Sequence, residues 1–162
     1  MAIDFSQVKT ITIPEGSVKK ITDSAGNTLW QGVGWHTVWE GSQKIGYGGW
    51  TGSEYLFATE PYSNSLKIRV SFSSISAYPT SSGDDYSVSY IPSDNKSPVT
   101  YESFSSYQTE LVKAYIRNSS RQSYYGAYLY YNKGTGEIYG TASGNKSYAR
   151  AYIVITKIEI YS

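Results

Sequence analysis

Alternation of apolar and polar side chains constrains this chain more than any other feature. Residues 66–73 place leucine, isoleucine, valine and phenylalanine at every second position, with lysine, arginine or serine between them. A period of two is typical of an antiparallel strand that buries one face and leaves the other polar. No stretch of useful length has apolar residues at the spacing of a helix. We therefore expect an all-β protein.

Strand signals recur along the rest of the chain, at 35–40, 54–58, 86–91, 112–117, 122–131, 138–141 and 153–160. Residues 132–136 predict a hairpin loop. About eight short strands with turns between them predict an antiparallel, jelly-roll-like β-sandwich over residues 35–162, with a closed barrel as the alternative. In the last strand the apolar face switches around Thr156 and Lys157, which indicates a bulge or a register change.

Residues 1–31 form a separate N-terminal segment. It contains three short runs with strand character, joined by turns at 14–17 and 24–27, and Gln31-Gly32-Val33-Gly34 separates it from the rest. Three short strands cannot bury much surface. We therefore expect this small β-stranded segment to lean on another surface, which is the main domain, a sister chain or a different protein.

The composition excludes several classes of function. The chain has 162 residues, no cysteine and one histidine, so it has no disulfide, no thiolate or multi-histidine metal site and no cysteine nucleophile. Its net charge of +1 lacks the basic excess that nucleic-acid binding normally requires. The longest apolar run, 151–155, is far shorter than the ~20 residues that span a bilayer, and the N-terminus has no signal-peptide pattern.

Candidate catalytic and metal-binding residues lack supporting motifs. His36 begins a strand, with no Gly-x-Ser-x-Gly motif elsewhere to suggest a serine nucleophile. The acidic residues are scattered, and Asp84 and Asp85 have no calcium-loop spacing. The glycine-rich residues 46–52 precede no helix that could hold a phosphate. We therefore predict a non-enzymatic protein with no metal and no cofactor.

Tyrosine is the strongest signal for binding. The chain has 18 tyrosines, most densely placed in residues 122–131, where strand alternation puts Tyr124, Tyr128 and Tyr130 on one face. Tyr125, Ala127, Leu129 and Tyr131 share the other face. Exposed aromatic rings offer contact area at low entropic cost and can stack on sugars. The candidate glycan-binding residues are Trp50, Tyr124, Tyr128 and Tyr130; the alternative is that tyrosine packs strands and fills a trimer interface.

The most specific pattern covers residues 8–30, which read Val8-x-x-Ile11-x-Ile13-Pro14-Glu15-Gly16-x-Val18-x-x-Ile21-x-Asp23-x-x-Gly26-x-x-Leu29-Trp30. This pattern resembles an N-terminal module of virion structural proteins from tailed bacteriophages that infect Gram-positive bacteria. Residues 35–41 and 153–161 are also similar to phage tail and appendage β-sandwiches. The resemblance implies a tail-fibre, baseplate or receptor-binding component, or a head-surface fibre or decoration protein, and it carries no catalytic motif.

The resemblance further implies that residues 1–31 dock the chain onto other virion proteins. The candidate docking residues are Val8, Ile11, Ile13, Val18, Ile21, Leu29 and Trp30. We expect synthesis in the cytoplasm of the bacterial host, symmetric assembly as a homotrimer, and display of residues 35–162 on the virion surface, where a host polysaccharide is the candidate ligand. Two other functions stay open: a carbohydrate-binding module and, ranked last, a glycan depolymerase.

Overall fold

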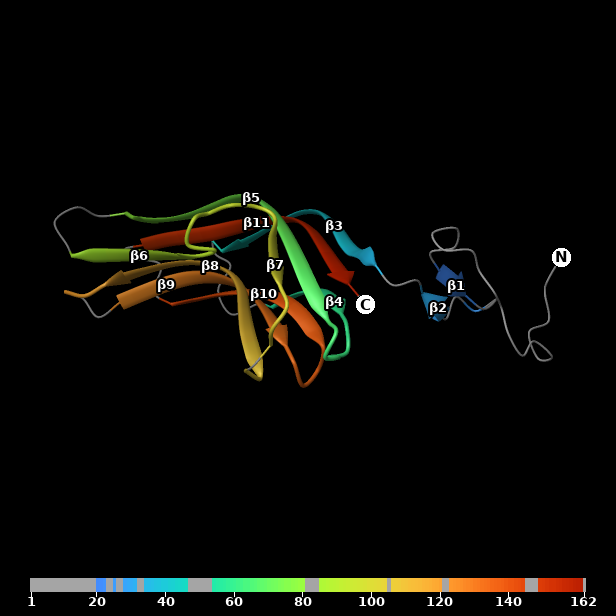
Figure 1. Cartoon of the computed structure of the whole chain (residues 1–162). Helices are drawn as coiled ribbons and strands as arrows, with labels where there is room; N and C mark the ends of the chain where they lie inside the picture. Colours follow the sequence, from blue (N-terminus) through green and yellow to red (C-terminus); the bar gives the residue numbers. More distant parts are fainter. Residues whose placement is uncertain are drawn as a thin grey trace, which may run out of the picture. The chain divides into compact units, whose positions relative to one another are not determined.

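A computed structural model describes the chain at residues 20–22, 25, 28–31, 34–46, 54–80, 85–104, 106–120, 123–144 and 149–161. The chain divides into two compact units, Met1–Gly34 and Trp35–Ser162. The described residues form strands and their connections (Figure 1). None of these residues belongs to a helix long and apolar enough to cross a membrane.

The described part of the first unit is a two-stranded antiparallel sheet. Strand β1 spans Lys20–Thr22 and β2 spans Thr28–Gln31, with Ile21 opposite Trp30. Both strands fall in the second and third runs that the sequence predicts. Among the predicted docking residues, Ile21, Leu29 and Trp30 lie in these strands, and those outside the described residues are Val8, Ile11, Ile13 and Val18.

The second unit is an antiparallel β-sandwich (Figure 1). Its strands are β3 (Trp35–Gly46), β4 (Tyr55–Thr59), β5 (Lys67–Pro79), β6 (Tyr86–Ile91), β7 (Val99–Tyr101), β8 (Gln108–Asn118), β9 (Ser123–Asn132), β10 (Glu137–Gly144) and β11 (Ala149–Tyr161). One sheet has the order β4–β10–β9–β8–β6 and the other β3–β11–β5–β7. Because the strands form two separate sheets, the sandwich prediction is confirmed and the closed-barrel alternative is wrong.

The strand pairing is nested in the manner of a jelly roll. The first strand of the sandwich, β3, pairs with the last, β11, and the second, β4, pairs with the second to last, β10. Strands β8, β9 and β10 add a meander of neighbours in one sheet. Trp35 and Tyr161 are register partners, so the sandwich begins and finishes at the same end.

The alternating pattern of β5 is confirmed by its burial. Ile68, Val70 and Phe72 face the core, as does Leu66 just before the strand, whereas Lys67 and Arg69 lie on the outer face with partial exposure. Fully buried partners of these side chains come from both sheets and include Leu111, Ile116, Tyr125, Leu129, Tyr131, Ile138 and Ile153. Removal of this apolar surface from water is the main source of stability for such a sandwich.

The predicted irregularity in the last strand is a β-bulge. The register between β11 and β5 shifts between Ile155 and Lys157, and β3 shows a shift at the same place. Thr156 is therefore the extra residue that returns the following isoleucines to the core. As a result Ile158 and Ile160 are as fully buried as Ile153 and Ile155.

The structure differs from the strand prediction in the length of several strands and in one additional strand. β5 continues to Pro79, β8 begins at Gln108 and β11 begins at Ala149, each beyond the predicted bounds. β3 continues to Gly46, well past the predicted end at residue 40, because its pairing with β11 continues there. β7 was not predicted, since three residues are too few to show an alternating pattern. The predicted loop at 132–136 is confirmed as the β9–β10 connection, in which Gly136 has a φ of 78°, a left-handed conformation that glycine adopts readily.

Candidate functional site

Strand β9 divides its tyrosines between the two faces of the five-stranded sheet, as the alternation predicts. Tyr125 and Tyr131 are fully buried in the core. Tyr124, Tyr128 and Tyr130 lie on the outer face, where the register places them opposite residues of β8 and β10. Three of the four predicted glycan-binding residues therefore share one surface, and Trp50 lies outside the described residues.

Two further tyrosines join this surface and complete what we call the tyrosine row: Tyr115, Tyr124, Tyr128, Tyr130 and Tyr139. Tyr139 of β10 lies directly opposite Tyr130, and their ring centroids are 5.7 Å apart. Tyr115 of β8 lies between Tyr124 and Tyr128, at centroid distances of 6.3 Å and 6.5 Å. Sequence reasoning missed both residues because only the strand register brings them into line with β9.

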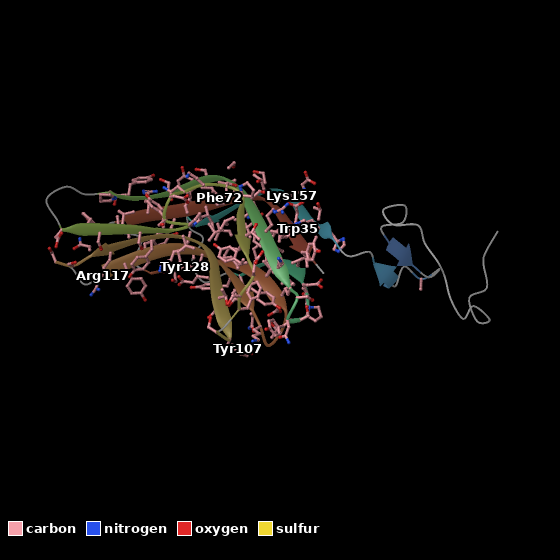
Figure 2. The ribbon with its side chains drawn as sticks, in the orientation of Figure 1. Trp35, Phe72, Tyr107, Arg117, Tyr128 and Lys157 are labelled. Carbon is pink, nitrogen blue, oxygen red and sulfur yellow. The ribbon has the colours of Figure 1, made fainter. Side chains whose placement is uncertain are left out.

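The rings of the tyrosine row differ in how much surface they offer. Tyr128 and Tyr130 are nearly parallel, with an interplanar angle of 12° and a centroid distance of 5.4 Å. The Tyr128 ring also lies over Gly126, where a Cβ atom would overlap it. Tyr128 is therefore only 7% exposed, whereas Tyr124 is 48% exposed. Of the three predicted side chains, Tyr124 offers a large ring surface to a ligand, and Tyr128, labelled in Figure 2, packs against its neighbours.

One ion pair lies beside the tyrosine row. Lys113 Nζ is 3.2 Å from Glu110 Oε2, and the same ammonium lies 5.1 Å from the centroid of Tyr115 and 6.0 Å from that of Tyr128. A cation over ring faces is attracted by their negative potential. Lys113 therefore stabilises the positions of the Tyr115 and Tyr128 rings and neutralises the charge of Glu110.

Within the tyrosine row, burial keeps the hydroxyls of Tyr128, Tyr130 and Tyr139 protonated. It raises the pKa of Tyr128 to about 12, partly offset by a hydrogen bond with Ser143. Burial is also the main cause of the raised pKa of Tyr130, to which the Glu110 carboxylate adds, and of the raised pKa of Tyr139. Gln108 donates a hydrogen bond from Nε2 to the Tyr139 hydroxyl. These hydroxyls can thus act as donors through the neutral and mildly alkaline range.

His36 stays apart from the tyrosine row, because β3 belongs to the four-stranded sheet. His36 lies near the start of β3, opposite Ile160. Its electrostatic effect is on Glu60: burial raises the pKa of that carboxyl, and His36 partly lowers it again. Asp84 lies outside the described residues, and Asp85 is exposed. Within the residues that the structure describes, no three acidic or histidine side chains are grouped so that they could hold a metal ion.

The structure also has a pocket, which we call the loop pocket and which the sequence does not predict. It has a volume of about 290 Å³ and lies where the β4–β5, β7–β8 and β9–β10 connections meet. The residues that define its chemistry are Tyr62, Asn64, Leu66, Glu102, Phe104 and Lys133. No sequence pattern joins them, because they come from three connections far apart in the chain. The only local signal of a binding site is the aromatic side chain of Tyr62 close to the amide side chain of Asn64.

No protein-family model, no curated protein and no solved structure matches this chain. The described geometry and the pattern in residues 8–30 are therefore the observations that bear on function. They comprise a two-stranded sheet in the first unit, a tyrosine row on one face of the sandwich, and a polar pocket between its loops.

Proposed function

We propose that this chain is a non-enzymatic structural appendage of a tailed-bacteriophage virion. Residues 1–31 attach it to other virion proteins, and residues 35–162 display the β-sandwich at the particle surface. The observation that carries the proposal is the pattern of residues 8–30, which ends just before the boundary between the two compact units at Gly34. A segment that resembles an attachment module is thus a separate unit from the sandwich.

The described strands of the two units also differ in how much packing against another surface they need to be stable. β1 and β2 are three and four residues long, and a two-stranded sheet of this kind is marginally stable in water without further packing. The sandwich buries a continuous core of its own between two sheets. A virion protein that packs against β1 and β2 would supply burial to this short sheet, which favours attachment through this end.

Attachment is tested by incorporation into particles. The full chain and a chain that lacks residues 1–31 are each produced during infection by a phage whose own copy is deleted. Particles are purified and probed with an antibody against the sandwich. We expect the full chain and a Tyr124→Ala variant to be incorporated, and the shortened chain to be absent from particles while soluble in the lysate. Equal incorporation of the shortened chain contradicts the docking role.

Carbohydrate binding is the second candidate function, and the tyrosine row favours it. Tyr124 offers an exposed ring, and Tyr115 supports it at a centroid distance of 6.3 Å and an interplanar angle of 24°. Exposed aromatic rings of this kind suit the apolar face of a sugar. We expect the full chain to bind host wall polysaccharide and Tyr124→Ala to bind it less well. Equal binding by both proteins contradicts a role for this face.

A further inference from the structure

The loop pocket is formed by connections that are fixed to one another. The Glu60 backbone N–H donates to the Gly136 carbonyl at 2.8 Å, and the Lys133 N–H donates to the Tyr107 carbonyl at 2.8 Å. The Tyr131 hydroxyl, from the core, donates to the Glu60 carbonyl at 3.0 Å. Tyr107 lies at the tip of the β7–β8 connection (Figure 2). Such bonds preform the pocket, as is usual for small-ligand sites.

The pocket is lined mainly by polar groups. Leu66 and Phe104 lie beneath them and are almost fully buried. The Tyr62 hydroxyl donates to Asn64 Oδ1 at 3.1 Å, which leaves the Asn64 amide nitrogen as a donor toward a ligand. Glu102 accepts from Lys67 Nζ through Oε1 at 2.8 Å, so its other oxygen can accept a further hydrogen bond.

Lys133 adds a positive charge to the pocket, and the groups that contact its ammonium are uncharged. Its Nζ donates to the Phe104 carbonyl at 3.2 Å and lies 3.9 Å from the centroid of the Tyr62 ring. Among the described residues, no carboxylate forms an ion pair with this ammonium, and Glu102 is already paired with Lys67. A ligand anion would therefore meet a positioned charge with hydrogen-bonding capacity to spare.

We propose that the loop pocket binds one hexose unit that carries an anionic substituent, a carboxylate or a phosphate. The substituent lies against Lys133 Nζ, and the sugar hydroxyls bond to Asn64 and Glu102. The volume of about 290 Å³ is at the lower limit of the ~300–1,000 Å³ typical of ligand pockets, which fits a single sugar unit. This inference deepens the proposed carbohydrate binding and places it at a second site.

The test uses the full chain, labelled with ¹⁵N, and two-dimensional NMR with sodium glucuronate, glucose 6-phosphate and glucose as probes at millimolar concentration. We expect one or both anionic sugars to shift backbone signals of residues 62–66, 102–104 and 132–134, and glucose to bind at least about tenfold more weakly, because a hydrogen bond to a charged group contributes roughly 1.5–3 kcal/mol.

Matched variants separate the charge from the fold. Lys133→Met keeps the aliphatic stem. It should weaken the binding of anionic sugars about tenfold and leave the binding of glucose unchanged. Asn64 lies in an exposed turn, and Asn64→Ala should weaken the binding of every sugar that binds the pocket. Lys96→Met, which removes an exposed lysine of the β6–β7 connection, should change nothing.

Three results overturn the inference: no shift with either anionic sugar, equal affinity for glucose and the anionic sugars, or shifts confined to the tyrosine row. None of them bears on incorporation into particles, so failure here is distinguishable from failure of the attachment proposal.

Discussion

At the scale of single residues, Gly126 determines how the outer face of the five-stranded sheet is built. Its missing side chain lets the Tyr128 ring lie along β9, where a Cβ atom at position 126 would overlap the ring and its hydroxyl. In this position Tyr128 packs against Tyr130 and Tyr115 and is largely hidden from water. Tyr115, which lies beside the exposed Tyr124, therefore packs on a ring whose position depends on a residue without a side chain.

Replacement of this glycine tests that dependence. We expect Gly126→Ala to displace the Tyr128 ring toward solvent, to lower its pKa from about 12 toward 10, and to cost about 1–3 kcal/mol of unfolding free energy, as steric overpacking does. Spectrophotometric titration of the tyrosines and urea unfolding measure the two effects. Gly134→Ala is the control, since its Cβ would meet the Tyr107 ring, which is 67% exposed and can move away. Equal behaviour of both variants contradicts the packing role of Gly126.

The raised pKa of Tyr128 also predicts how stability changes with pH. A free tyrosine has a pKa of about 10, and burial raises that of Tyr128 to about 12 in the folded chain. The neutral hydroxyl therefore contributes stability that is fully present below about pH 10 and is lost as the pH rises through about 12. Urea unfolding should show a steeper loss across this range for the wild-type chain than for Tyr128→Phe. Identical slopes contradict this prediction.

At the scale of strands, the sequence is informative where burial follows a simple period. The alternating side chains of β5, the two faces of β9 and the bulge of β11 are all visible in the order of apolar residues, because each strand buries one face against the opposite sheet. β7 is too short for such a pattern. The alignment of Tyr115 and Tyr139 with β9, and the meeting of three connections at the loop pocket, depend on long-range register, which no local pattern encodes.

The bulge in β11 gives a prediction at this scale. Deletion of Thr156 should leave Ile158 and Ile160 on the core face, because with one residue fewer they continue the alternation of Ile153 and Ile155 without a bulge. Deletion of Val154 instead puts Ile155 out of phase with the core, and exposure of that buried isoleucine costs about 1.5–3 kcal/mol. The measurement is thermal unfolding by circular dichroism, in which the Thr156 deletion should keep a Tm closer to wild type than the Val154 deletion. A Thr156 deletion that lowers the Tm as much as the Val154 deletion would contradict the role of Thr156 as the extra residue.

At the scale of the whole molecule, the chain forms a small first unit and a much larger second unit. The first unit contributes a two-stranded sheet in its described part, and the second contributes two packed sheets with a continuous core, an aromatic outer face and a loop pocket. The proposed attachment segment and display domain correspond to these two units. The same assignment predicts a symmetric oligomer on the particle, for which we propose three copies.

We propose above all that this chain is a virion part whose sandwich faces outward. The most direct measurement is a cryo-electron microscopy map of intact particles of the phage that encodes it. We expect density for the β-sandwich of residues 35–162 at the outer surface, in copies related by symmetry, with the N-terminal residues against another virion protein. A particle map without this chain, or one in which the sandwich is enclosed and residues 1–31 face solvent, would contradict the claim.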